Sequence, residues 1–357
     1  MSGTPARTAA DATASDVVCL GESMVTFLPS RPGRLADVPS FGRGIGGAES
    51  NVACALARAG HRAAWVSRVG ADGFGDHLVD AISAYGVDTS AVRRDPDRPT
   101  GIYFRTATDR AADVHEVAYY RAGSAASAMS PANVPHEALS AGRVLHLSGI
   151  TAALSADCLA LLRELTAPRP GRPLVSFDVN HRPGLWRGGD ASPGVLLDLA
   201  RGADLVFAGE DEAEEAWGIT AGAEAIREAL PEPAVLVVKR GAQGATVFSR
   251  PGAGGAGSRP DTVTDVPALR VDVVAPVGAG DAFAAGFLSA TLRGLPVRDR
   301  ARHGHLMAAA VLTVPGDLTD PPARDRADRL AALDDAAWGR LRLGPGWTGD
   351  DTEVRST

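Results

Sequence analysis

Cysteine, aromatic residues and long apolar runs are scarce in this chain of 357 residues. Its three cysteines, Cys19, Cys54 and Cys158, are odd in number and lack metal-ligand spacing, which argues against a disulfide framework and suits a reducing cytosol. No apolar run reaches the length that a membrane-spanning helix needs. Residues 1–15 lack the apolar stretch of a signal peptide, so we interpret them as a disordered leader and expect a cytoplasmic protein.

The chain also has no excess of positive charge. Its formal net charge of −7 makes nucleic acid or an anionic membrane an unfavourable partner. Neither a nucleotide-binding G-x-x-x-x-G-K-[ST] loop nor the motif set of protein kinases is present. The length and the apolar content of 45% are typical of a globular protein with one large α/β domain or two smaller ones.

Short apolar runs alternate with helical patterns along most of the sequence. This alternation predicts a doubly wound, mostly parallel β-sheet with helices on both faces, in a domain that spans 16–337. The glycine, proline and charge of 338–357 indicate a loose tail. We expect strands at Asp16–Gly21, Ala64–Val69, Val144–Leu147, Leu174–Asp178, Asp204–Phe207 and Val235–Lys239, and helices at Ala48–Ala59 and Phe74–Tyr85 that end at Gly60 and Gly86.

Two segments, about 24–41 and 99–122, interrupt the alternation with mixed polar strand patterns. We predict that they form a small β-sheet lid outside the main sheet, in which Gly101–Thr106 and Val114–Arg121 pair as a hairpin. The exposed edges of such a lid favour pairing with a second copy of the chain, so we expect a homo-oligomer.

The stretch Ala275–Phe287 carries the most informative chemical pattern. Gly278, Ala279 and Gly280 run into Asp281 and then into an apolar helix, so consecutive backbone N–H groups at a helix N-terminus form an anion site. An aspartate beside an anion site fits a base that takes the proton of a hydroxyl while a phosphoryl group arrives. A helix cap with close glycine packing would give the same local pattern.

A glycine-rich segment, Gly42–Asn51, contains a formal G-x-G-x-x-G. A dinucleotide fingerprint directly follows a strand, whereas Pro39 precedes this one and the predicted strand lies about twenty residues upstream. We therefore interpret Gly46 and Gly47 as a turn where the backbone approaches a polyhydroxyl ligand. Asn51 is placed to bond a ligand hydroxyl or a nearby backbone group.

Together these elements resemble the ribokinase-like (PfkB) carbohydrate kinases over about residues 16–325. The resemblance rests on three motifs in order, Gly46-Gly47-Ala-Glu-Ser-Asn51, Val69-Gly70-Ala-Asp72-Gly-Phe-Gly75 and Gly278-Ala-Gly280-Asp281. It implies a doubly wound α/β domain with a β-lid, and transfer of a phosphoryl group from ATP, with Mg²⁺, to a sugar hydroxyl.

Within that family the chain is similar to the 2-keto-3-deoxygluconate kinases, which phosphorylate a sugar acid. A sugar acid carries a carboxylate, which arginine holds through a two-pronged, charge-assisted contact. Arg121 and Arg182 are the matching candidates, although Arg182 could instead pair with Asp178. The similarity is carried by Gly21-Glu22-Ser-Met, Tyr119-Tyr120-Arg121-Ala-Gly-Ser124, Ser148-Gly149-Ile150-Thr151 and Phe177-Asp178-Val-Asn180-His-Arg182.

The resemblance also implies a role for each matching residue. Asp281 accepts the proton of the terminal hydroxyl, while the amides of Gly278, Ala279 and Gly280 stabilise the transferring phosphoryl group. Tyr103 and Tyr119 of the lid would contact the sugar, or could instead be ordinary strand-packing residues. Lys239 would contact phosphate, or could simply end its strand in solvent. The sugar side comprises Gly46, Gly47, Asn51, Tyr103, Tyr119, Arg121, Arg182 and Asp281, and the ATP side comprises Lys239, Gly241, Gly244, Gly278, Gly280 and His305.

Three positions depart from the family pattern. Ala275 stands where an aspartate commonly helps to hold a monovalent cation, which leaves a requirement for potassium open. The segment 209–212 matches the Asn-x-x-Glu element only at Glu212, which weakens the expected indirect role of that side chain in organising Mg²⁺. His305 falls where asparagine or a small residue is common, so it either stacks on the base or caps its helix.

The leading interpretation is a kinase that converts 2-keto-3-deoxygluconate to its 6-phosphate. A kinase for fructose, for another neutral sugar or for 2-keto-3-deoxygalactonate is the first alternative. A non-catalytic sugar-binding relative that kept the fold is the second.

Overall fold

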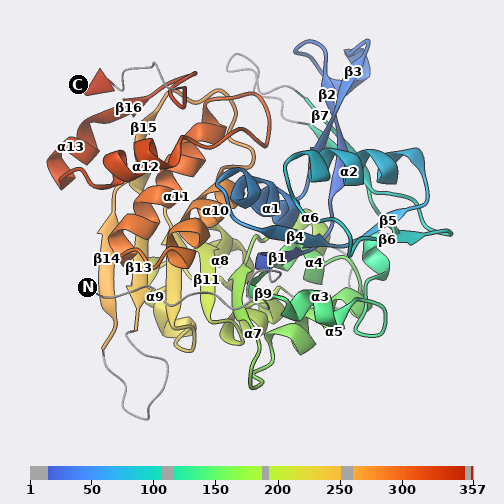
Figure 1. The fold of residues 1–357 in the computed structure, drawn as a ribbon, viewed down its shortest axis with the longest axis horizontal. Helices are drawn as coiled ribbons and strands as arrows, with labels where there is room; N and C mark the ends of the chain where they lie inside the picture. Colours follow the sequence, from blue (N-terminus) through green and yellow to red (C-terminus); the bar gives the residue numbers. More distant parts are fainter. Residues whose placement is uncertain (1–14, 107–115, 187–192, 251–259, 350–354, 357) are drawn as a thin grey trace, which may run out of the picture.

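The short apolar runs of the sequence form the inner strands of an eight-stranded sheet in the computed structural model (Figure 1). The structure describes residues 15–106, 116–186, 193–250, 260–349 and 355–356. In spatial order the strands are β14 (Thr262–Val266), β13 (Ala245–Ser249), β12 (Val235–Lys239), β11 (Leu205–Gly209), β10 (Leu174–Asp178), β9 (Gly142–Ser148), β1 (Ser15–Leu20) and β4 (Ala63–Val66). Neighbours from β12 to β4 pair in parallel, and β13 and β14 add antiparallel strands at one edge, so the predicted mostly parallel sheet is confirmed.

Helices cover both faces of this sheet, because strands of a parallel sheet present apolar side chains on both sides. Along β1, Val17 and Cys19 face one hydrophobic cluster, while Val18 and Leu20 face the other. The first cluster includes residues of α1 (Ala48–Arg58), α2 (Gly73–Ala84), α10 (Ala279–Leu292), α11 (Val297–Leu312) and α12 (Arg324–Ala331). The second includes residues of α3 (His136–Ser140), α4 (Gly149–Ala152), α5 (Ala156–Thr166), α7 (Gly194–Arg201), α8 (Glu210–Trp217) and α9 (Gly222–Ala229).

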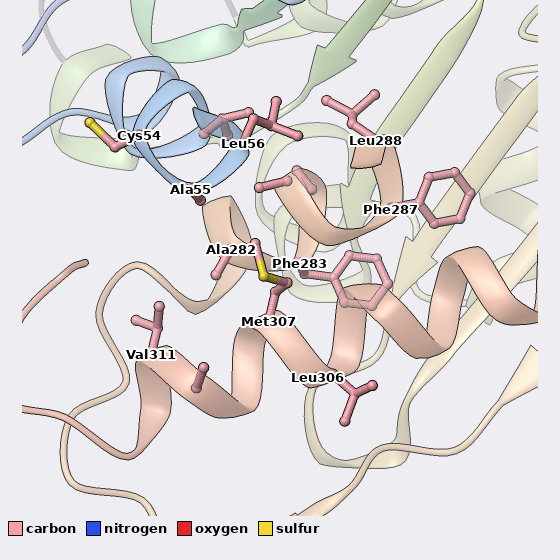
Figure 2. Close-up of a cluster of buried hydrophobic side chains, with 14 of the residues drawn as sticks. Cys54, Ala55, Leu56, Ala282, Phe283, Phe287, Leu288, Leu306, Met307 and Val311 are labelled. Atoms are coloured by element: carbon pink, nitrogen blue, oxygen red, sulfur yellow. The ribbon is translucent and has the colours of Figure 1, made fainter. Parts of the chain in front are cut away.

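Within the first cluster, helices α10 and α11 hold candidate functional residues in place. Figure 2 shows Phe283 and Phe287 of α10 packed between the sheet and Leu306 of α11. The ring of Phe287 meets that of Phe207 edge-on, with ring centroids 5.5 Å apart. Each such buried ring contributes about 1.5–3 kcal/mol relative to an exposed one, so the position of α10 against the sheet is strongly fixed.

A four-stranded lid stands beside the central sheet, as the sequence predicts (Figure 1). Its strand order is β3 (Phe41–Gly46), β2 (Met24–Pro29), β7 (Ile102–Arg105) and β8 (Val117–Tyr120). The pair β7–β8 is antiparallel, which confirms the hairpin, whose turn lies outside the described residues. On β7, Tyr103 and Arg105 are buried, while Phe104 stacks on Phe27 with ring centroids 4.7 Å apart.

Two local predictions are corrected by the structure. The lid segment expected at about 24–41 extends to Gly46, because 41–46 form β3 and pair in antiparallel register with β2. The turn expected at Gly46 and Gly47 lies where β3 ends and α1 begins. The strand expected at Ala64–Val69 breaks at Ser67. The chain there leaves β4 of the central sheet and continues as β5 (Arg68–Gly70), which pairs with β6 (Arg93–Asp95).

The interpretation of 338–357 as a loose tail is wrong for residues 338–349. Trp338, Leu343 and Trp347 are almost completely buried and belong to the first hydrophobic cluster. Trp338 lies in α13 (Asp335–Arg340), Leu343 ends β16 (Leu341–Leu343), and Trp347 follows that strand. Strand β16 pairs with β15 (Arg270–Val271) and β17 (Arg355–Ser356). Apolar side chains spaced along this short segment outweigh its glycine and charge content.

Two further predictions concern the N-terminal leader and membrane-spanning helices. The predicted leader lies outside the described residues up to residue 14, and Ser15 already belongs to β1. Among the described residues, no helix combines the length and the apolarity that crossing a membrane requires.

Candidate active site

The candidate residues gather at the carboxyl ends of the central strands. Strand β10 ends at Asp178 and β12 at Lys239, and α10 begins at Ala279 directly after Gly278. Ligands of open α/β sheets bind at this edge, because the loops that leave the strands and the N-termini of the following helices meet there.

The N-terminus of α10 lies where the sequence predicts an anion site. Gly278 has a left-handed backbone with φ of 78°, and a Cβ there would lie 2.6 Å from the carbonyl oxygen of Asp317. Both facts require glycine at this position. The N–H of Ala282 bonds to the carbonyl of Gly278, whereas the N–H groups of 279–281 have no partner within the helix. These three groups can therefore bind an anion.

Asp281 lies in the first turn of this helix, beside the anion site. Its Oδ2 accepts a hydrogen bond of 2.8 Å from Nδ2 of Asn51, which lies on α1. Burial and the nearby carboxylate of Asp178 raise the pKa of Asp281 to about 7, although the Asn51 hydrogen bond and the charges of Arg182 and Lys239 act in the opposite direction. A carboxylate with this pKa is suited to accept a proton near neutral pH.

Lys239 is the only lysine in the sequence, and it lies mostly buried next to this helix. Its Nζ is 3.0 and 3.2 Å from the two carboxylate oxygens of Asp178 and 3.9 Å from Oε2 of Glu212. Burial alone would lower the pKa of Lys239, but these two carboxylates outweigh it and raise the pKa. A Cβ on Gly280 would lie 3.7 Å from Nζ, so the ammonium group lies beside the anion site.

Two alternatives for these charged side chains are thereby excluded. Lys239 does not end its strand in solvent, and Asp178 pairs with Lys239 rather than with Arg182. The side chain of Arg182 is half exposed, with Nη1 3.7 Å from Oε1 of Glu212. It lines an open cavity of about 1300 Å³ together with Lys239, Gly241, Gly244, Ala279, Gly280 and His305. This cavity collects the residues that the sequence assigns to the nucleotide, and Arg182 with them.

The lid contributes a second group of side chains around Asp317, a residue that the sequence analysis missed. Oδ1 of Asp317 accepts a hydrogen bond of 2.7 Å from Nη2 of Arg105, and Oδ2 accepts one of 3.2 Å from Oη of Tyr103. A Cβ on Gly46 would lie 2.3 Å from that hydroxyl, which explains the glycine. Since the backbone of Asp317 also touches Gly278, this group joins the lid to the anion site.

Arg121 lies at the end of lid strand β8, close to Gly47 and Tyr119. Its Nη2 forms an ion pair with the fully buried carboxylate of Glu22, and its guanidinium lies 5.8 Å from the ring centroid of Tyr119. A Cβ on Gly47 would lie 2.4 Å from the carbonyl oxygen of Glu22. Of the predicted sugar-side residues, Arg121 and Tyr119 thus lie together and Gly47 lies against the main chain of Glu22, whereas Arg182 lines the cavity that contains Lys239.

The match to a family model identifies the family of the chain. The model of the pfkB family carbohydrate kinases matches residues 14–324. The chain belongs to the pfkB family of carbohydrate kinases.

Curated relatives of this kinase agree in length and in the class of reaction. A 2-dehydro-3-deoxygluconokinase of Bacillus subtilis strain 168 is 36% identical over 87% of this chain and 94% of its own. One from Thermoproteus tenax is 34% identical over 88% and 93%. A 2-dehydro-3-deoxygalactonokinase of Haloferax volcanii is 31% identical over 85% and 93%.

Solved structures show the same fold. A PfkB protein from Polaromonas sp. JS666 superimposes with a TM-score of 0.74 at 35% identity and covers 90% of this chain and 100% of its own. A sugar kinase from Pyrococcus horikoshii, solved in complex with ATP, gives a TM-score of 0.73 at 25% identity over 87% and 96%.

His305 of the kinase is packed rather than free. Its Nε2 lies 3.3 Å from the carbonyl oxygen of Val266, and its ring meets that of Phe283 edge-on with centroids 5.1 Å apart. Burial lowers the pKa of His305 to about 4, so the ring is neutral at pH 7. It lines the nucleotide-side cavity, where its contact with a base stays a prediction.

The described residues do not form a resident site for Mg²⁺. No group of three His, Cys, Asp or Glu side chains among them could hold a metal. Oε2 of Glu212 instead accepts a hydrogen bond of 2.8 Å from the N–H of Gly209 and faces Lys239, which uses the carboxylate that the sequence assigns to Mg²⁺. Ala275 is buried and offers no carboxylate for a monovalent cation.

Sequence reasoning missed Arg105, Asp317 and the role of Glu22. Asp317 lies 36 residues after Asp281 in an irregular segment, and only tertiary packing brings it to the site. Glu22 stands inside a motif that the sequence analysis quotes, and a buried acid directly after a strand is the signal that could have identified it.

Proposed function

We propose that this kinase transfers the γ-phosphoryl group of Mg-ATP to the terminal hydroxyl of 2-keto-3-deoxygluconate and forms its 6-phosphate. The observation that carries the proposal is the position of Asp281. It is a carboxylate with a pKa of about 7 in the first turn of the helix whose N-terminus offers free N–H groups.

In the proposed reaction, Asp281 takes the proton of the sugar hydroxyl while its oxygen attacks the γ-phosphorus. The bond between that phosphorus and the bridging oxygen breaks, and ADP leaves with the electron pair. The N–H groups of 279–281 stabilise the charge on the transferring group. Lys239 and Arg182 supply positive charge from the nucleotide side.

The lid completes the reaction site. Tyr103 and Tyr119 extend from paired lid strands, with ring centroids 5.4 Å apart, and would lie over the sugar. A sugar held between the lid and Asn51 would be shielded from water, which limits transfer of the phosphoryl group to a water molecule. The buried Oδ1 of Asn51 has no hydrogen-bond partner among the described residues, so it can accept a hydrogen bond from a sugar hydroxyl.

Arg121 and the names of the relatives support a sugar acid as substrate. Arg121 is the cation that the lid brings to the sugar side, and the relatives from Bacillus subtilis and Thermoproteus tenax are named 2-dehydro-3-deoxygluconokinase. The galactonate epimer is the second candidate, because a relative of similar coverage is named for it. A neutral sugar such as fructose is the third, because the ion pair with Glu22 already neutralises Arg121.

The test is ADP production from Mg-ATP with 2-keto-3-deoxygluconate, 2-keto-3-deoxygalactonate, gluconate, fructose and ribose, each with and without potassium. We expect turnover with a keto-deoxy acid and no dependence on potassium, since Ala275 has no carboxylate. Preference for fructose or ribose would contradict the sugar-acid pocket.

Replacement of the proposed base gives the second part of this test. Asp281→Asn should lower kcat by at least about a hundredfold, because the amide cannot accept the proton. Asp299→Asn is the matched control, since Asp299 lies in the first turn of the neighbouring helix α11. Turnover by Asp281→Asn close to that of the control would favour a non-catalytic or differently catalysed site.

A further inference from the structure

Glu22 is a buried acid at the sugar side that neither touches the anion site nor belongs to the hydrophobic core. Its side chain is fully buried between β1 and β2. Oε2 faces Nη2 of Arg121 in an ion pair, and Oε1 accepts a hydrogen bond of 2.5 Å from Oγ of Ser124. Both oxygens are thus directed at the end of the lid, where Arg121 leaves β8.

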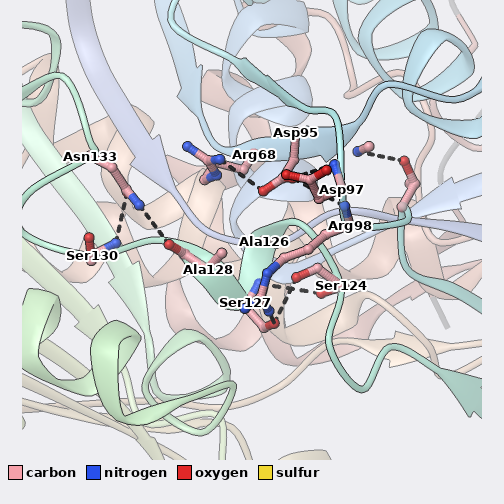
Figure 3. Close-up of polar contacts among 12 residues, drawn as sticks. Arg68, Asp95, Asp97, Arg98, Ser124, Ala126, Ser127, Ala128, Ser130 and Asn133 are labelled. Carbon is pink, nitrogen blue, oxygen red and sulfur yellow. Dashed lines mark hydrogen bonds and ion pairs between the residues drawn. The ribbon is translucent and has the colours of Figure 1, made fainter.

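The structure holds Glu22 in one position. A Cβ on Gly101 would lie 2.9 Å from Oε1 of Glu22, so this glycine provides the space for the carboxylate. Ser124 is fixed as well, since its carbonyl accepts a hydrogen bond of 2.7 Å from Oγ of Ser127 (Figure 3). Nη1 of Arg98 contacts the same Oγ at 3.4 Å, which ties the segment to the loop before β7. A fixed carboxylate in turn fixes the guanidinium that it holds.

The guanidinium of Arg121 is only partly used by this ion pair. Its Nε is buried and has no hydrogen-bond partner among the residues that the structure describes. Its side chain lies near the face of the Tyr119 ring, which limits its rotation from the other side. A guanidinium held on two sides has a fixed orientation, which suits a charge-assisted contact with a ligand carboxylate.

A second buried acid, Glu49, would compete for Arg121 if Glu22 were removed. Oε1 of Glu49 accepts hydrogen bonds of 2.8 Å from Ser148 and 2.7 Å from Thr151, whereas its Oε2 has no partner in the described part of the chain. The carboxylate of Glu49 lies against Gly21, next to Glu22 in the chain, and the charge of Arg121 opposes the rise in the pKa of Glu49 that burial causes. Without Glu22, the guanidinium would turn toward Glu49 and away from the sugar, rather than gain a free charge for the substrate.

We propose that Glu22 is a positioning residue, which orients Arg121 so that its guanidinium meets the carboxylate of a sugar acid. The proposal rests on the proposed function, since it concerns selection of an acid over a neutral sugar at the same site. Glu22 acts through Arg121 and does not contact the reacting atoms.

The test is a double-mutant cycle of Glu22→Ala and Arg121→Ala, with KM and kcat measured for 2-keto-3-deoxygluconate. Glu22→Ala should raise KM for the acid about tenfold, because a misdirected arginine loses its two-pronged contact. kcat and KM for ATP should change less than about threefold, since Asp281 and the nucleotide side are untouched. In the Arg121→Ala background, Glu22→Ala should have no further effect on KM, and Glu22→Gln should rescue part of the loss because it keeps an acceptor for Arg121.

Asp261→Ala is the matched control. It breaks another mostly buried pair, Arg227–Asp261, whose atoms are 2.7 Å apart near the far edge of the sheet, and should leave KM for the acid unchanged. Thermal unfolding of each variant reports whether the fold is intact.

The outcomes separate this inference from the function that it refines. If the unmodified kinase prefers a neutral sugar, the proposed function and the inference fail together. If it uses the acid but Glu22→Ala leaves KM unchanged, lowers KM, or adds fully to Arg121→Ala, the function stands and the inference is wrong.

Discussion

Asn51 shows how single contacts set the chemistry of the candidate base. Burial raises the pKa of Asp281, and the hydrogen bond from Asn51 Nδ2 opposes that rise because it favours the ionised form. The base must be ionised to act, so kcat of the unmodified kinase should fall as the pH drops below about 7. Asn51 thus extends the pH range over which the base works.

The substitution Asn51→Ala removes the hydrogen bond to Asp281. Loss of the hydrogen bond should move the acid limb of kcat upward by about one pH unit, so activity falls at pH 7 and recovers near pH 9. The check is a pH profile of kcat at saturating substrate. Ser50→Ala is the control, because Ser50 bonds to Ser23 and Gly47 instead. An unshifted limb with a uniformly lower kcat would mean that Asn51 holds only the sugar.

At the scale of elements, a buried ion pair joins lid strand β7 to Asp317, in the segment that follows α11. Arg105 of β7 and Asp317 are both nearly inaccessible, and their atoms are 2.7 Å apart. Burial raises the pKa of Asp317, while Arg105 and Tyr103 partly counter this rise. Breaking a buried pair leaves a charge without compensation, whereas an exposed pair contributes little.

Arg105→Leu should therefore lower the free energy of unfolding by about 3 kcal/mol and raise KM for the sugar. Arg34→Leu is a matched control, because Arg34 pairs with Asp37 between the lid strands β2 and β3, where both side chains are more than half exposed. It should leave the free energy of unfolding almost unchanged, because both charges remain hydrated whether or not they pair. Urea unfolding measures both values, and equal losses would show that the Arg105 pair does not anchor the lid.

At the scale of the whole molecule, the sequence predicts those parts of the fold that local patterns determine. The runs Leu174–Asp178 and Val235–Lys239 coincide with β10 and β12, because continuous apolar residues are typical of a parallel sheet. The motif around Asp281 predicts the helix N-terminus for the same local reason. Glycine-rich β3 and the contacts of Asp317 were missed, since both depend on partners distant in the sequence.

The packed segment 338–349 gives the last prediction and the clearest contrast between composition and structure. Trp338 is fully buried, its Nε1 donates a hydrogen bond of 2.9 Å to the carbonyl of Pro267, and Arg302 lies 4.6 Å from its ring centroid. Trp338→Ala should lower the free energy of unfolding by about 3–5 kcal/mol, measured by guanidinium chloride denaturation. Trp217→Ala, at a partly buried tryptophan of α8, should cost less than half as much. A loss below about 1 kcal/mol for Trp338→Ala would favour the interpretation of this segment as a loose tail, because an unpacked segment contributes no buried surface to the fold.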